Sequence, residues 1–137
     1  MTAPISRTPT FFIDDGTLYC EFSDFVIQPV SSVSANQWYH VAMTYDSSYN
    51  VKVYLNGVLT TQGVASDPGV LNAVGIGAYV AYAPDGAEQF FNGLVDEIRL
   101  YGRPLSATEV KDTYDGKSVT TGLLSWHFSA RELPKLL

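Results

Sequence analysis

Two adjoining stretches decide the fold of this chain: Gln37-Trp-Tyr-His-Val-Ala-Met-Thr-Tyr-Asp46 and Val51-Lys-Val-Tyr-Leu-Asn-Gly-Val58. In both, large apolar residues recur at every second position, and this periodicity predicts β-strands. Asn56-Gly57 predicts a tight type I′ hairpin turn, because both turn residues must take a positive φ angle. The centre of the chain is therefore expected to be antiparallel sheet.

The same alternation predicts which side chains share a face. In the first stretch one face carries Tyr39, Val41, Met43 and Tyr45, and the other carries Trp38, His40, Ala42 and Thr44. In the second, Val51, Val53 and Leu55 lie on one face, with Lys52 and Tyr54 opposite. We expect one face of each strand to point into a core.

Further strands are predicted on both sides of this centre. Phe11–Asp14 and Thr17–Phe22 flank Asp15-Gly16, another hairpin signal. Two more strands are expected over residues 73–80 and 90–101. Many short strands separated by turns predict an all-β, antiparallel two-sheet sandwich.

One short helix is predicted after these strands. Ser106-Ala-Thr-Glu109 is a capping box, in which the serine hydroxyl and the glutamate carboxylate each accept a backbone amide of the other residue. Leu105 and Val110 stand where a hydrophobic staple would close over the first turn. The helix should stop near Asp115-Gly116.

Composition narrows the class of protein. Of the 137 residues, 46% are hydrophobic and 16% charged, which excludes a disordered chain. The net charge of −6, with scattered Lys and Arg, argues against a nucleic-acid partner. The sequence contains no run of 18 apolar residues, so no membrane-spanning helix is predicted. Cys20, the one cysteine, cannot form an intrachain disulfide and is interpreted as a small buried hydrophobe.

Taken together, these segments resemble the laminin-G-like, concanavalin A-like lectin/glucanase domains. Residues 37–58 resemble the central hairpin of that family, 91–101 its last strand and 103–110 the helix that follows. The resemblance extends over roughly residues 9–115. It implies an antiparallel two-sheet jelly-roll sandwich with one short helix near the C-terminal end, as a single domain over residues 1–137.

The C-terminus departs from the family's order. Thr121-Gly-Leu-Leu-Ser-Trp-His-Phe128 resembles the strand with which the family usually begins. Residues 121–137 are thus interpreted as a permuted first strand, the start of a next repeat, or the end of a natural fragment. Leu124, Trp126 and Phe128 share an apolar face that should be buried by the same sandwich or by a neighbour, as in a strand-swapped homodimer.

Asp96 is the candidate metal ligand. Alternation places it with Leu94, Ile98 and Leu100 on a face that we expect to point into the core. A buried carboxylate must be paired or metal-bound. The resemblance implies calcium at this aspartate, and the alternative is a carboxylate satisfied by backbone amides, Arg99 or His127.

The candidate carbohydrate site lies in the loop around residues 81–89. Aromatic faces cover the apolar patches of sugars, while planar polar side chains bind the hydroxyls. Both kinds of residue gather here: Tyr79, Tyr82, Asp85, Glu88 and Gln89. Trp38, Tyr49 and Tyr54 are further aromatic candidates, and the alternative for each tyrosine is that it covers the sheet surface.

No catalytic residues are predicted. Glucanases of this fold carry Glu-x-Asp-x-x-Glu along one strand, and that string is absent from the sequence. Asp96 and Glu97 are neighbours, so in a strand they would point to opposite faces. His40 and His127 have no nucleophile elbow beside them.

The sequence therefore predicts a non-catalytic binding module of a larger extracellular or cell-surface protein. Its expected partner is a glycan or polysaccharide, with calcium as a candidate cofactor. The alternative is a structural or assembly domain that mediates protein–protein contacts. An exposed aromatic platform beside polar side chains would favour the first, and an apolar patch or open strand edge the second.

Overall fold

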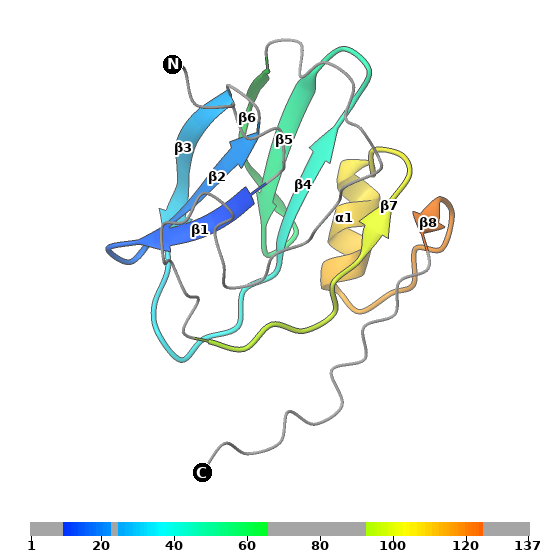
Figure 1. Cartoon of the computed structure of the whole chain (residues 1–137). Coiled ribbons are helices and arrows are strands. Elements are labelled where there is room, and N and C mark those ends of the chain that lie inside the picture. Colours follow the sequence, from blue (N-terminus) through cyan, green and yellow to red (C-terminus); the bar gives the residue numbers. More distant parts are fainter. Residues whose placement is uncertain (1–9, 23–24, 66–92, 125–137) are drawn as a thin grey trace. The chain divides into compact units, whose positions relative to one another are not determined.

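The computed structural model describes residues 10–22, 25–65 and 93–124 (Figure 1). The chain divides into two compact units, each described here by itself. The described part of the first unit comprises residues 10–22, 25–65 and 103–119; that of the second comprises 93–102 and 120–124. The expected single domain over residues 1–137 stays a prediction.

Two antiparallel three-stranded sheets form the first unit (Figure 1). The first sheet has the order β1-β2-β3, with strands Thr10–Asp14, Thr17–Phe22 and Phe25–Ser32. The second has the order β4-β5-β6, with strands Val41–Tyr45, Asn50–Leu55 and Val58–Val64. The predicted β-sandwich with one short helix is confirmed.

Both predicted hairpin turns are present. Asp15 and Gly16 join β1 to β2 with φ angles of 44° and 71°, and Asn56 and Gly57 join β5 to β6 with 51° and 77°. The left-handed conformation explains why these residue types stand there. The Asn56 turn is also tied to β4, because the Asn56 side chain accepts the His40 amide at 3.0 Å.

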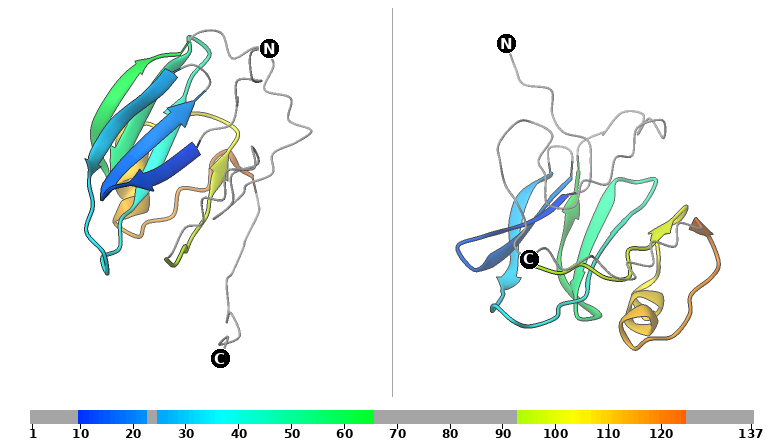
Figure 2. Two further views of the ribbon diagram at one scale, coloured as in Figure 1. Left: turned by 60° about the vertical axis from the view of Figure 1, so that its left-hand side comes forward. Right: turned by 60° about the horizontal axis from the view of Figure 1, so that its bottom comes forward.

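The core of the first unit draws side chains from both sheets, which face each other as two layers (Figure 2). Its fully or nearly fully buried members are Leu18, Cys20, Val30, Val51, Val53 and Ala65. Val41, Met43, Tyr45 and Leu55 pack against them. The predicted inward faces of β4 and β5 are confirmed for these residues, and Cys20, the one cysteine of the sequence, is buried, as expected.

Two strands differ from the sequence prediction: β3 is an additional strand, and β4 has a different first residue. β3 was not predicted, because Pro29 lacks an amide donor and interrupts the apolar alternation. The β2–β3 ladder accommodates it with register shifts, and β3 lies at the edge of its sheet. β4 begins at Val41 rather than Trp38, so the inward position expected for Tyr39 precedes the strand.

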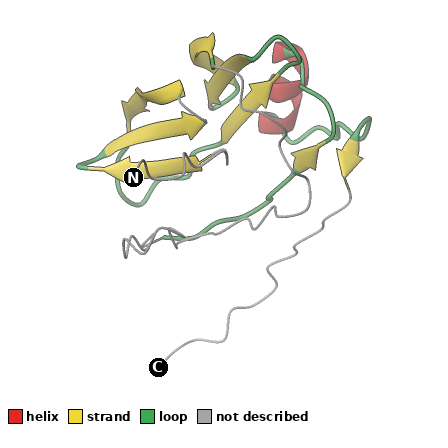
Figure 3. Ribbon diagram, turned by 45° about the horizontal axis from the view of Figure 1, so that its top comes forward, coloured by secondary structure: helices red, strands yellow, loops and turns green. Residues whose placement is uncertain are grey.

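The helix α1 spans Ala107–Tyr114 (Figure 3). Ser106 and Glu109 form the predicted capping box, and Val110 is fully buried. The helix ends at Asp115, followed by Gly116 with a φ angle of 77°. No helix in the described residues has the length and apolarity needed to cross a membrane.

α1 lies on the outer face of the β4-β5-β6 sheet, opposite the core. The Thr113 hydroxyl is 3.4 Å from Nε2 of His40, and the Tyr114 ring is 5.9 Å from the His40 ring. At the β5–β6 turn, a Cβ atom on Gly57 would stand 2.9 Å from Lys111 Cδ and 3.1 Å from Tyr114. The helix therefore packs directly on the backbone of this turn.

The described part of the second unit contains one short antiparallel pair. β7, Leu100–Tyr101, pairs with β8, Leu123–Leu124, and the Gly102 amide donates to the Gly122 carbonyl at 2.8 Å. Of the strand predicted over residues 121–128, Leu123–Leu124 are in β8, residues 121–122 form a turn, and residues 125–128 lie outside the described residues. The interpretations of residues 121–137 as a permuted first strand, the start of a next repeat or the end of a natural fragment stay predictions.

The strand expected over residues 90–101 is wrong for Gly93–Arg99, which is not in a strand. Glu97 has a φ angle of 52°, and this left-handed residue interrupts the extended backbone. The alternation of faces assumed from the sequence does not hold across such a break. Leu94, Ile98 and Leu100 are accordingly exposed.

Substitution of Gly57 tests the packing of α1 on the hairpin. Gly57→Ala places a side chain in the left-handed conformation and against Lys111 and Tyr114, so it should lower the free energy of unfolding by about 1–3 kcal/mol. Gly116→Ala is the matched control, because Gly116 has the same φ angle of 77° with nothing within 4 Å of the added Cβ. Urea unfolding of both variants should show the larger loss for Gly57→Ala, and equal losses would contradict the packing.

Candidate functional site

A pocket of about 310 Å³ lies in the first unit, between the outer face of β4 and β5 and the chain that leads into α1. The sheet side and its following turn contribute Thr44, Asp46, Asn50, Lys52 and Tyr54. The other side is formed by Arg103, Pro104, Leu105, Ser106, Ala107 and Glu109. Its volume is at the lower end of the range of small-molecule sites.

Strand register brings the sheet residues together. Asn50, Lys52 and Tyr54 lie at alternate positions of β5, on the face opposite Val51 and Val53. Thr44 of β4 is directly opposite Lys52, since the two are partners in the ladder. One polar stripe thus crosses both strands on the side that α1 partly covers.

Two residues with hydroxyl groups are the most buried ones of this lining. Tyr54 is 2% exposed and Thr44 is 8% exposed, and both line the pocket. Within the described part of the chain, neither side chain has a hydrogen-bond partner. Each hydroxyl is therefore free to donate and accept hydrogen bonds on the pocket side.

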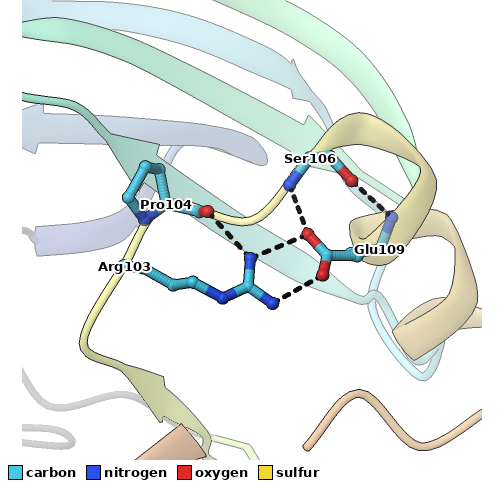
Figure 4. Close-up of polar contacts among 4 residues, drawn as sticks. All are labelled: Arg103, Pro104, Ser106 and Glu109. Atoms are coloured by element: carbon cyan, nitrogen blue, oxygen red, sulfur yellow. Dashed lines mark hydrogen bonds and ion pairs between the residues drawn. The ribbon is translucent and has the colours of Figure 1, made fainter. Parts of the chain in front are cut away.

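The wall beside α1 is a network of ion pairs and hydrogen bonds (Figure 4). Arg103 donates to both carboxylate oxygens of Glu109, Nη1 to Oε2 at 2.9 Å and Nη2 to Oε1 at 2.5 Å. The same Oε2 accepts the Ser106 amide at 2.8 Å, while the Arg103 guanidinium also donates to the Pro104 carbonyl. The Arg103 guanidinium, with the Ser106 amide, lowers the pKa of Glu109 to about 2.

The rim is built by a turn centred on Asp46. Its Oδ1 accepts the backbone amides of Ser48 at 2.9 Å and Asn50 at 3.0 Å, and Oδ2 accepts Nδ2 of Asn50 at 2.8 Å. The hydrogen bonds from Asn50 lower the pKa of Asp46. Lys52 is exposed beside this turn and has no ion-pair partner among the described residues.

A laminin-G family model of the concanavalin A-like lectin/glucanases superfamily matches residues 6–111. The chain belongs to this superfamily. The match covers the central hairpin and most of α1, the segments on which the resemblance in sequence rests, and it includes every residue that lines the pocket. Membership indicates a binding or adhesion type of module and names no ligand.

Two further comparisons set the limits of this assignment. A crystal structure of residues 221–444 of an S-layer domain-containing protein from Clostridium thermocellum is similar, with a TM-score of 0.48 and 23% sequence identity. The similarity covers 83% of this concanavalin A-like chain and 65% of the other. No curated protein matches the chain.

The predicted carbohydrate-binding residues of this laminin-G-like chain lie outside the described residues. They are Tyr79, Tyr82, Asp85, Glu88 and Gln89. The three further aromatic candidates differ from one another: Trp38 is 66% exposed, Tyr49 is half-buried and stacks on Tyr45, and Tyr54 is 2% exposed. An open stacking surface at Tyr54 is ruled out, because the tyrosine lies on the face that α1 partly covers.

The core position predicted for Asp96 is wrong. Its side chain is exposed, and Oδ1 accepts the amide of Glu97 at 2.8 Å. The reason is the left-handed Glu97, which ends the alternation on which the prediction was based. In the described part of the chain, no three His, Cys, Asp or Glu side chains gather where they could hold a metal ion. The calcium assignment stays a prediction.

The sequence prediction missed the pocket itself. Its sheet side could have been inferred, since Thr44, Lys52 and Tyr54 were all assigned to outward faces of adjacent strands. No sequence pattern indicates that the segment with Arg103 and Glu109 lies over these strands, because its position depends on where α1 packs. Only the capping box indicated that Glu109 would be turned back toward its own helix terminus.

The pH dependence of stability tests the wall of the pocket. The Glu109 pKa lies below its ordinary 4.5 in the folded chain, so its stabilising effect is present above pH 4.5 and is lost as the pH falls toward 2. Thermal melts should show Glu109→Gln destabilised at pH 7, with the difference from wild type disappearing near pH 2. Glu97→Gln, which breaks an exposed pair with Arg99, should cost little at any pH. A Glu109→Gln deficit that is independent of pH would contradict the assignment.

Proposed function

We propose that this chain is a non-catalytic carbohydrate-binding module of an extracellular or cell-surface protein. The observation that carries this proposal is the pocket on the outer face of β4 and β5, where free hydroxyl groups are exposed and carboxylates are already engaged. Membership in a superfamily of lectins and glucanases supports sugars as the class of ligand and leaves two possibilities, binding and hydrolysis.

Hydrolysis is disfavoured by the state of the two pocket carboxylates. Glycosidases need a carboxylic acid whose pKa is raised, so that it is protonated near neutral pH and can donate to the leaving group. Glu109 and Asp46 both have lowered pKa values, and hydrogen bonds occupy both oxygens of each. Neither can act as the acid in this pocket.

The lining suits a sugar because it combines polar groups with apolar surface. Thr44 and Tyr54 present hydroxyls, while Pro104, Leu105 and Ala107 present carbon atoms on the opposite side. Sugars have hydroxyl groups around a ring whose faces carry C–H groups, so they need both kinds of contact. A rigid sheet holds the polar groups in place before binding, which reduces the entropy lost on association.

The loop around residues 81–89 is proposed as a second contributor to ligand contact. Tyr79 and Tyr82 would supply aromatic faces, and Asp85, Glu88 and Gln89 would supply polar groups. Loops held by a rigid scaffold commonly carry recognition. Calcium at Asp96 is proposed as an accessory to the same function, with the remaining ligands from the solvent or other segments.

One observation favours an assembly role as a second candidate function. β6 is an edge strand of its sheet in the described chain, and it exposes Val58 at 63%, Leu59 at 43% and Val64 at 65%. Exposed apolar residues on a sheet edge favour contact with another chain. Sedimentation of the full chain from micromolar to millimolar concentration should show reversible self-association if this edge is used, and a monomer throughout would reject self-assembly.

A glycan array tests the proposed function directly. The full chain should bind a restricted set of glycans, and incubation with those glycans should release no reducing sugar, because neither carboxylate of the pocket has the raised pKa that a glycosidase acid needs. The array is run once with calcium and once with EDTA, and a loss of glycan binding in EDTA would show that binding depends on a metal ion. No bound glycan in either buffer would reject the proposal, and released sugar would reject its non-catalytic part.

Substitution of Tyr82 tests the loop. Tyr82→Ala should weaken binding to the glycan selected by the array by about 1–3 kcal/mol, as expected for loss of a stacking anchor, with the melting temperature unchanged. Tyr82→Phe is the matched control, because it keeps the aromatic face and removes only the hydroxyl. Equal affinities of Tyr82→Ala and wild type would remove the loop from the binding site.

A further inference from the structure

We propose that the pocket between β4–β5 and the start of α1 binds an acidic sugar at the end of a glycan, with its carboxylate on Lys52 and its hydroxyls on Thr44 and Tyr54. This inference rests on the proposed function and assigns to it a site and a class of ligand. Its residues differ from those predicted in the loop around 81–89 and from Asp96.

The charge of the ligand follows from the charges that line the pocket. Arg103 and Glu109 neutralise each other in a two-bonded ion pair. The Asp46 carboxylate is held by the amides of its own turn. Lys52 forms no ion pair in the described chain, although its charge helps to lower the pKa of Asp46. A carboxylate on the ligand would give Lys52 a direct ion pair.

The hydroxyls of the ligand follow from the two buried polar side chains. Thr44 and Tyr54 are more than nine-tenths buried, yet neither hydroxyl has a protein partner in the described chain. Both hydroxyl oxygens keep some contact with solvent, so a ligand hydroxyl would take the place of water bound there. Each of these groups both donates and accepts, as a sugar hydroxyl does.

Their spacing allows one sugar ring to meet all three groups. Thr44 and Lys52 are direct cross-strand partners, and Tyr54 is two residues further along β5 on the same face. Directly opposed side chains on one sheet face lie about 4.5–5.5 Å apart at Cβ, and diagonal neighbours about 7–8 Å. A ring that carries a carboxylate and several hydroxyls spans such distances.

The shape of the pocket favours an end residue over the middle of a long chain. The Arg103–Glu109 network and the capped first turn of α1 close one side. A volume of about 310 Å³ is at the lower end for small-molecule sites, so it suits a terminal sugar better than a long polysaccharide segment.

The test compares two glycosides that differ only in charge, methyl β-D-glucuronide and methyl β-D-glucoside. Each is titrated at low salt into the full ¹⁵N-labelled chain, and amide shifts are followed. The glucuronide should shift the amides of Thr44, Lys52, Tyr54 and Ala107. It should bind about tenfold more tightly than the glucoside, as expected for a charge-assisted hydrogen bond.

Three variants separate binding from folding. Lys52→Gln should abolish the preference for the glucuronide, because it removes the charge that distinguishes the two glycosides. Tyr54→Phe keeps the buried ring and removes the hydroxyl, so it should weaken both glycosides equally. Lys117→Gln is the matched control, because it removes the same charge from an exposed lysine outside the pocket lining. Melting temperatures confirm that each variant is folded.

The possible results are distinguishable. Equal affinity for the two glycosides, a preference that survives Lys52→Gln, or shifts confined to residues outside the pocket would each overturn the inference. If the glycan array shows binding under any of these outcomes, the proposed function stands and its site lies elsewhere. If neither the array nor the titration shows binding, both proposals fail together.

Discussion

The position of α1 depends on the absence of a side chain at Gly57. The β5–β6 turn needs a positive φ angle there, and the helix residues Lys111 and Tyr114 lie so close that a Cβ atom would collide with them. One glycine therefore meets two requirements, one local and one tertiary. With the helix seated on this turn, Val110 is fully buried and Thr113 lies beside His40.

The pocket is a consequence of that seating. Once α1 lies on the outer face of β4-β5-β6, the segment that enters the helix passes over the polar stripe of β4 and β5. The capping box then has two roles. It satisfies amides at the helix start, and through Glu109 it holds Arg103 as part of the pocket wall. The same capping box therefore stabilises the helix terminus and shapes the candidate binding site.

Both carboxylates of the pocket have lowered pKa values. The superfamily includes lectins and glucanases, so the fold alone cannot separate binding from catalysis. Here, each carboxylate in the pocket is stabilised in its charged form by donors from its own segment. Two hydroxyl groups and one ammonium group remain available to contact a ligand in the pocket.

The sequence by itself determined those features that depend on neighbours along the chain. Asp15-Gly16 and Asn56-Gly57 specified their turns through backbone conformation, and Ser106 with Glu109 specified the start of α1. Alternation assigned the inward faces of β4 and β5 correctly, because a paired strand repeats every two residues. It failed at Asp96, where the left-handed Glu97 breaks that repeat, and β3 escaped detection because of Pro29. Tertiary structure alone decided that Tyr54 is buried and that Arg103 faces Thr44 across a pocket. Those contacts join segments about fifty residues apart, and their geometry depends on how a helix packs on a sheet, which no local pattern encodes.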